Sequence, residues 1–326
     1  PSTSTHPPSS SLWQKFLSLV RFMFGQANYK LQPNIEANNE KLLLPVSVKE
    51  AIQMLVAQKD RIPISGGATL VAMMNANLIN PPSLVSLKGI NEINGIRQNE
   101  NGSVSIGAFS RHAETANSKL LTGSLSGIKN AASKIANPTV RNMGTIGGSI
   151  AFADPAADYA PALVAADAEI ELASSYGNRL IKASDFFVDW YKTAMKPGEI
   201  IVAVHLPSVD PNAVGYHEKF ARVEGDFATV SVNVILSMDG DTCNYIRVAV
   251  GACGPAPVRL PEAEELLIGK PLKENLLLQA GRMLSVACDP IDDVRGSAAY
   301  RLQLIPGLLL TAAEKAQRQI LESYSS

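Results

Sequence analysis

The chain has 326 residues, of which 46% are hydrophobic and 18% are charged, and this composition excludes a disordered or collagen-like protein. At roughly 150 residues per domain, the length predicts two domains. The 29 basic and 30 acidic residues give a net charge of -1, so the chain lacks the basic excess that marks nucleic-acid-binding proteins.

Residues 1–40 differ in composition from the rest of the chain. Residues 1–12 are rich in Ser, Thr and Pro, as in an unfolded tail. Trp13, Phe16, Val20 and Phe24 then recur at spacings of three and four residues, which predicts a short amphipathic helix. No apolar run in the sequence reaches the roughly 18 residues that a bilayer span needs. We therefore expect an N-terminal extension whose helix docks on this chain or a neighbour, and we regard a targeting segment as the weaker alternative.

The folded body is predicted to begin near residue 41. Ser47 and Glu50 have the spacing of a capping box, and they precede a helix that turns Ala51, Met54 and Leu55 inward. A strand at 62–65 follows, then a Gly-Gly turn at 66–67 and a further helix.

Later segments alternate between strand and helix patterns. We expect β-strands within 84–89, 93–100, 103–110, 168–172, 199–207, 230–236 and 245–254, and helices within 111–135, 260–287 and 299–322. A domain boundary is predicted near 208–214.

Two glycine turns, at 65–69 and 145–149, are the clearest functional motifs. Glycine lets backbone N–H groups approach one anion closely, which is how phosphates are held without a side-chain charge. Ser65, Thr69, Thr145 and Ser149 add hydroxyl groups at these turns. Neither turn has the spacing of a Rossmann or P-loop motif. Taken alone, they could also be ordinary turns of a mixed α and β domain.

Four motifs in order carry a family resemblance: SGGATL at 65–70, RNMGTIGGS at 141–149, DPAAD at 154–158 and KFARVEGDFATV at 219–230. The chain from about 42 to 322 resembles the FAD-binding medium subunit of the molybdenum hydroxylases, the family of xanthine dehydrogenase, carbon monoxide dehydrogenase and aldehyde oxidoreductase. The resemblance implies an α+β fold. A two-lobed FAD-binding domain of the vanillyl-alcohol-oxidase/PCMH type would occupy 41–208, and a smaller α+β domain with a three-stranded antiparallel sheet would occupy 209–326.

The same resemblance assigns cofactor-binding residues. Residues lining the FAD pyrophosphate would be Ser65, Gly66, Gly67, Ala68, Thr69 and Leu70, and those of a second backbone cradle would be Thr145, Ile146, Gly147, Gly148 and Ser149. The start of the C-terminal domain would also contribute to the flavin site.

Three side chains beyond the turns are implied to contact FAD. Asp158 would accept a hydrogen bond from the polyol region, Lys219 would lie near the flavin ring, and Phe227 would cover the isoalloxazine. Ala68 departs from the family pattern, since relatives often have Thr or His there. Residues 1–40 precede the usual family start.

The sequence offers no metal site of its own. Cys243, Cys253 and Cys288 are too few for the four thiolates of an iron–sulfur cluster, and their scarcity favours a reducing, cytoplasmic location. The four histidines, His6, His112, His205 and His217, lack metal-ligand spacing and are interpreted as surface or packing residues.

The resemblance therefore implies an oxidoreductase subunit that transfers electrons through FAD. Molybdenum–pterin and two [2Fe-2S] clusters would lie on a large and a small partner subunit, in a dimer of heterotrimers. NAD, oxygen, a quinone or another molecule would be the terminal acceptor. Two alternatives stay open: a free-standing flavin oxidoreductase, and a degenerate flavin-fold scaffold without a cofactor.

Overall fold

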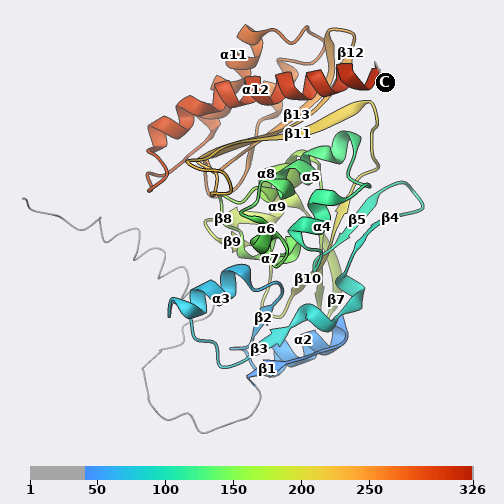
Figure 1. Cartoon of the computed structure of the whole chain (residues 1–326), viewed down its shortest axis with the longest axis vertical. Coiled ribbons are helices and arrows are strands. Elements are labelled where there is room, and N and C mark those ends of the chain that lie inside the picture. Colours follow the sequence, from blue (N-terminus) through green and yellow to red (C-terminus); the bar gives the residue numbers. More distant parts are fainter. Residues whose placement is uncertain (1–40, 325–326) are drawn as a thin grey trace, which may run out of the picture.

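A computed structural model describes residues 41–324, which form three tiers stacked along the long axis of the molecule (Figure 1). The predicted extension at 1–40 and its amphipathic helix lie outside the described residues. Within 41–324, no helix is long and apolar enough to cross a membrane.

The first tier is a small parallel sheet with two helices. Its elements are β1 (Leu42–Leu43), α2 (Val48–Ala57), β2 (Ile62–Ile64), α3 (Ala68–Asn75) and β3 (Leu84–Ser86), with strand order β1-β3-β2. The predicted cap of the first helix is confirmed, since Ser47 Oγ accepts from the N–H of Glu50 at 3.2 Å. Both the strand at 62–64 and the helix after the Gly-Gly turn form as predicted.

The second tier is built on an antiparallel five-stranded sheet. Its strands are β4 (Ile96–Gln98), β5 (Val104–Gly107), β6 (Glu169–Ser174), β7 (Gly177–Lys182) and β10 (Ile200–Leu206), in the order β4-β5-β10-β6-β7. Its helices are α4 (His112–Asn117), α5 (Ser126–Ser133), α6 (Pro138–Arg141), α7 (Ile146–Phe152), α8 (Tyr159–Ala165) and α9 (Ala183–Phe186). Strands β8 (Phe187–Asp189) and β9 (Lys192–Thr193) form a separate ribbon.

The prediction of one continuous helix over 111–135 was wrong, because two separate helices, α4 and α5, form there. Ser118 leaves the helical conformation with ψ of 131°, which ends α4. Gly123 has φ of +53°, a conformation that side chains rarely adopt. The segment therefore turns between α4 and α5 instead of continuing as one helix.

The third tier is the C-terminal domain. It contains β11 (Ala213–Phe220), β12 (Val230–Asp239), β13 (Thr242–Gly251), β14 (Val258–Arg259), α10 (Pro261–Glu265), α11 (Glu274–Ala287) and α12 (Ala298–Tyr324). The antiparallel sheet has the order β11-β12-β13-β14, so the two-residue β14 adds a fourth strand to the three expected. The α+β class is confirmed.

The C-terminal sheet is buried on both faces. One face packs on α11 and α12, through residues such as Val232, Val234 and Leu236. The other face packs on the helices of the second tier, and there Ile235 and Ala249 join the hydrophobic core of that tier. Figure 1 shows the sheet between these two helical layers. The predicted boundary at 208–214 covers most of the connection between β10 and β11 and the first two residues of β11.

Candidate functional site

The two glycine turns, 80 residues apart in sequence, lie directly against each other. The hydroxyl groups of Ser65 and Thr145 are hydrogen-bonded at 2.8 Å. A Cβ atom placed on Gly66 would lie only 1.8 Å from the carbonyl oxygen of Met143. Only glycine permits this approach, and the first and second tiers therefore meet at these turns.

The first turn presents an open row of hydrogen-bond donors. Gly67 adopts φ of +78° and is the N-cap of α3, with no side chain capping the helix. Among the residues that the structure describes, no protein acceptor pairs with the N–H groups from Gly66 to Leu70. Free N–H groups at the positive end of a helix bind phosphate well. The residues present at this turn thus fit the pyrophosphate of FAD.

The second turn differs, because its N–H groups already have protein acceptors. Those of Ile146 and Gly147 donate to carbonyl groups of the 108–110 segment at 3.0 and 2.9 Å, and that of Gly148 donates to Thr145 Oγ1 at 3.1 Å. Ile146 and Gly147 are also buried, whereas Gly148 is exposed and Ser149 is half-buried. This turn can therefore offer a ligand the space beside Gly148 and the Ser149 hydroxyl, rather than a row of free N–H groups.

Asp158 and Lys219 form a buried ion pair. Asp158 Oδ2 accepts from Lys219 Nζ at 2.8 Å, and Oδ1 lies 3.0 Å from His217 Nε2. The Asp158 side chain is 4% exposed and that of Lys219 is 6% exposed. Burial lowers the pKa of His217, although Asp158 opposes the shift. A neutral His217 donates from Nε2 to the carboxylate, which keeps lone pairs free for a further donor.

His217 is a site residue that the sequence interpretation missed. It lies two positions before Lys219 on β11, and side chains two apart on a strand project from the same face. The two-residue spacing of His217 and Lys219 on one strand was therefore the sequence signal that could have identified His217. The Nδ1 atom of His217 is buried and has no hydrogen-bond partner among the described residues.

His112 lies between the second turn and Tyr159, the residue that follows Asp158. Its backbone N–H donates to the carbonyl of Gly144 at 3.0 Å, and its imidazole Nδ1 lies 3.2 Å from the hydroxyl of Tyr159. Burial lowers the pKa of His112 to about 4, against the opposing charge of Asp158. His112 is therefore neutral at pH 7 and packs beneath the glycine turn.

Phe227 lies in the loop between β11 and β12 and is 46% exposed. Asp226 braces this loop: its carboxylate accepts from Arg222 at 2.9 and 3.0 Å and from the N–H of Phe227 at 2.9 Å. The next residue, Ala228, donates to the carbonyl of Ala156 at 3.4 Å. The loop is thus held against the DPAAD turn that carries Asp158.

Comparison with known proteins assigns the chain to a defined class. Residues 36–209 match the family model described as the FAD binding domain in molybdopterin dehydrogenase. Residues 216–316 match the model of the CO dehydrogenase flavoprotein C-terminal domain. The chain is an FAD-binding flavoprotein.

Individual relatives narrow the assignment. The chain is 33% identical to the glyceraldehyde dehydrogenase medium chain of Sulfolobus acidocaldarius, over 82% of this chain and 94% of the relative. It is 34% identical to the carbon monoxide dehydrogenase medium chain of Afipia carboxidovorans, over 84% and 95%. It belongs to the FAD-binding medium subunits of the molybdenum hydroxylases.

Solved structures agree with this assignment. A crystal structure of Cu,Mo-CO dehydrogenase in its cyanide-inactivated form has a chain that matches with a TM-score of 0.82 and 32% identity, over 86% of this chain and 98% of that one. A chain of quinoline 2-oxidoreductase from Pseudomonas putida 86 matches with a TM-score of 0.81 and 29% identity, over 88% and 99%. The predicted fold, family, oxidoreductase class and FAD cofactor are confirmed.

Proposed function

We propose that this chain is the electron-transfer subunit of its complex, taking electrons from [2Fe-2S] clusters of a partner and delivering them to a terminal acceptor. The observation that carries the proposal is the row of N–H groups at 66–70, which have no acceptor within residues 41–324 and face a second turn 80 residues away. Bound FAD would supply the redox chemistry, since it exchanges electrons with both one-electron and two-electron partners.

The residues of the first turn would hold the pyrophosphate of FAD. The N–H groups of Gly66 to Leu70 and the hydroxyl of Thr69 are the donors. Gly148 would leave space for the cofactor beside Ser65, since even a Cβ at Gly148 would come within 3.8 Å of the Ser65 Cβ. Ser149 would add a hydroxyl group.

The remaining predicted residues would orient the rest of the cofactor. Asp158 would accept from a polyol hydroxyl through its remaining lone pairs. Lys219 would act on the flavin through the field of the buried pair rather than as a free ammonium, because Asp158 and the carbonyl of Lys134 already accept from its Nζ. The half-exposed ring of Phe227 would cover the isoalloxazine.

Partner subunits would carry the other redox centres. A [2Fe-2S] cluster needs four ligands, usually cysteines, and this chain has three cysteines. The name 'medium chain' indicates that each of these relatives is one subunit of a larger complex. We propose an iron–sulfur small subunit and a molybdopterin large subunit, arranged as a dimer of heterotrimers. The three cysteines are free thiols in the structure, which favours a reducing, cytoplasmic location.

Reconstitution tests this function. The full chain is mixed with FAD, and the bound flavin and its affinity are measured. The complex purified from its source is then reduced with substrate, and flavin and iron–sulfur absorbance are followed by stopped flow. Stoichiometric FAD with reduction of the clusters before the flavin supports the proposal. An isolated chain that turns over a substrate without iron or molybdenum would establish the free-standing flavin oxidoreductase instead.

A further inference from the structure

The segment between α11 and α12 reaches back to the loop that carries Phe227. Arg295, in this segment, places its guanidinium carbon 5.5 Å from the centroid of the Phe227 ring. A cation over the face of an aromatic ring is attracted by the ring quadrupole, and the attraction is stronger where water is excluded. The two residues are 68 positions apart, so tertiary structure alone brings them together.

Arg295 is held in this position from its own domain. Its Nη1 atom lies 3.4 Å from Asp293 Oδ2, and its backbone N–H donates to Asp293 Oδ1 at 2.8 Å. Asp293 is also paired with Arg301, whose side chain is 3% exposed. A carboxylate fixed by a buried arginine is a rigid anchor, so the Arg295 side chain has little freedom to move away from the ring.

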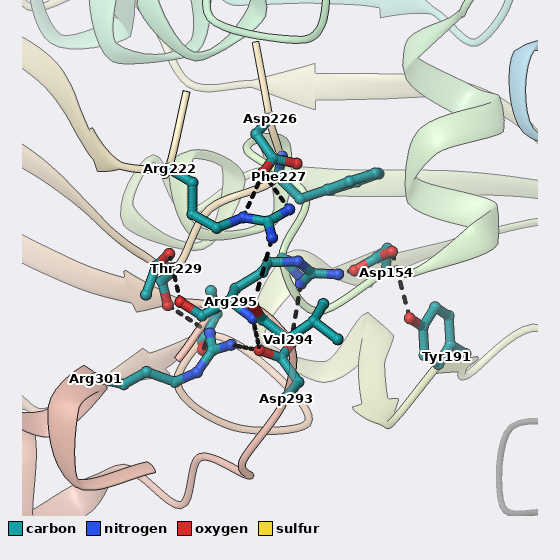
Figure 2. A network of polar contacts seen from close by, with 12 residues as sticks. Asp154, Tyr191, Arg222, Asp226, Phe227, Thr229, Asp293, Val294, Arg295 and Arg301 are labelled. Carbon is teal, nitrogen blue, oxygen red and sulfur yellow. Dashed lines mark hydrogen bonds and ion pairs between the residues drawn. The ribbon is translucent and has the colours of Figure 1, made fainter. Parts of the chain in front are cut away.

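The same segment is bonded to both ends of the Phe227 loop. Arg222 Nη1 donates to the carbonyl of Val294 at 3.4 Å, and Thr229 Oγ1 donates to the carbonyl of Arg295 at 3.4 Å. Arg301 Nη1 donates to the carbonyl of Thr229 at 2.5 Å. Figure 2 shows these contacts converging on the segment from several elements. The position of Phe227 thus depends on residues 293–301.

Arg295 also acts on the FAD-binding lobes. In Figure 2 its side chain extends toward Asp154, the first residue of the DPAAD turn. The Asp154 side chain is buried; its Oδ1 accepts from the N–H of Ala156 at 2.9 Å and its Oδ2 from the hydroxyl of Tyr191 at 3.4 Å. Burial raises the pKa of Asp154, and the charge of Arg295 opposes that shift. One guanidinium therefore interacts with the ring of Phe227 and with a buried carboxyl group of the other domain.

We propose that Arg295 is a positioning residue of the flavin site: from one side its guanidinium supports the Phe227 ring, so that the ring's other face is presented to the isoalloxazine. This inference rests on the proposed function, because it requires Phe227 to cover the flavin. It extends the site to the C-terminal segment 289–297, which none of the glycine motifs includes. The competing explanation is that Arg295 only stabilises the C-terminal domain through Asp293.

A double-variant experiment on the full chain separates these explanations. Arg295→Met removes the charge with little change in length, and Phe227→Ala removes the ring. The measurements are the dissociation constant of FAD and the fluorescence of bound FAD, which responds to the packing and solvent access around the isoalloxazine. Arg282→Met is the matched control, because Arg282 is an exposed arginine on α11 of the same domain.

We expect Arg295→Met to weaken FAD binding about two- to tenfold and to change the fluorescence of bound FAD. In the Phe227→Ala background the same change should have less than about a twofold effect, since the ring that it supports is absent. Arg295→Lys keeps a cation and should fall between the wild type and Arg295→Met.

Two results would overturn the inference. One is that Arg295→Met has the affinity and fluorescence of Arg282→Met. The other is that it weakens FAD binding equally with and without Phe227, which indicates a purely structural role. If Arg295→Met does not fold, an Arg295→Lys protein with wild-type fluorescence and affinity overturns the inference as well. Failure of the wild-type chain to bind FAD would instead refute the proposed function.

Discussion

Replacement of Gly66 by alanine tests the contact between the two glycine turns. The new Cβ would lie 1.8 Å from the carbonyl oxygen of Met143, whereas ordinary contacts begin at 3.4 Å. The turns must therefore separate by about 1.6 Å, because both partners are backbone. Such a movement breaks the 2.8 Å hydrogen bond between Ser65 and Thr145.

The expected cost of Gly66→Ala combines two effects. Overpacking costs about 1–3 kcal/mol, and loss of the hydroxyl hydrogen bond costs about 0.5–1.5 kcal/mol. Together they lower the free energy of unfolding by about 1.5–4.5 kcal/mol, which corresponds to a decrease in Tm of about 3–18 °C for a domain of this size. The affinity for FAD should fall at least about tenfold, since the first turn moves away from the second.

Thermal unfolding and FAD titration of the full chain measure both effects. Gly307→Ala is the control: a Cβ there has no neighbour within 4 Å, and the residue lies inside α12. This control should gain about 0.5–1 kcal/mol of stability from its higher helix propensity and should bind FAD normally. A Gly66→Ala protein with the Tm and FAD affinity of the wild type would show that the turns do not need this close approach.

Three further predictions concern buried polar groups. Asp158→Ala leaves the Lys219 ammonium buried without its carboxylate, so denaturant unfolding should show a free energy of unfolding lower by about 3–5 kcal/mol. The affinity for FAD should fall about ten- to a hundredfold. An unchanged affinity would argue against contact between Asp158 and the cofactor. The pKa of His112 is about 4 in the folded chain and 6.5 in the unfolded chain. The unfolded chain therefore binds more protons in acid. The free energy of unfolding should decrease by about 3 kcal/mol as the pH falls from 6.5 to 4. His112→Gln should flatten that decline, and an equally steep profile would exclude His112 as its cause. Glu264 accepts from Val248 N–H and from Arg259 at 2.8–2.9 Å, so Glu264→Ala should cost about 3 kcal/mol with FAD affinity preserved, and a parallel loss of FAD binding would contradict a structural role.

Local sequence signals predicted much of the fold. The Ser47 and Glu50 spacing located the start of α2, and the glycines at 66–67 located the end of β2 and the start of α3, because capping and positive φ depend on neighbouring residues. Apolar alternation located β12 in the same way. The ribbon of β8 and β9 and the strand β7 were not predicted; β7 alternates between half-buried and exposed residues and is stabilised by pairing with β6.

Features set by tertiary contacts could not be predicted from local pattern. The order β4-β5-β10-β6-β7 inserts a late strand between two earlier ones, which no local signal encodes. The glycines of the second turn predicted free N–H groups, but the 108–110 segment supplies acceptors for two of them. Likewise, the sequence around Arg295 contains nothing that indicates its contact with Phe227.

The backbone bonds between the DPAAD turn and the C-terminal domain bear on how the cofactor exchanges. The N–H of Ala252 donates to the carbonyl of Pro155 at 3.0 Å, beside the bond from Ala228 to Ala156, and Ile235 and Ala249 continue the core across the same boundary. A hinge opening there would break both bonds and expose apolar surface to water. FAD should therefore enter and leave with the two domains still closed on each other, and the radius of gyration of the chain should be the same with and without FAD.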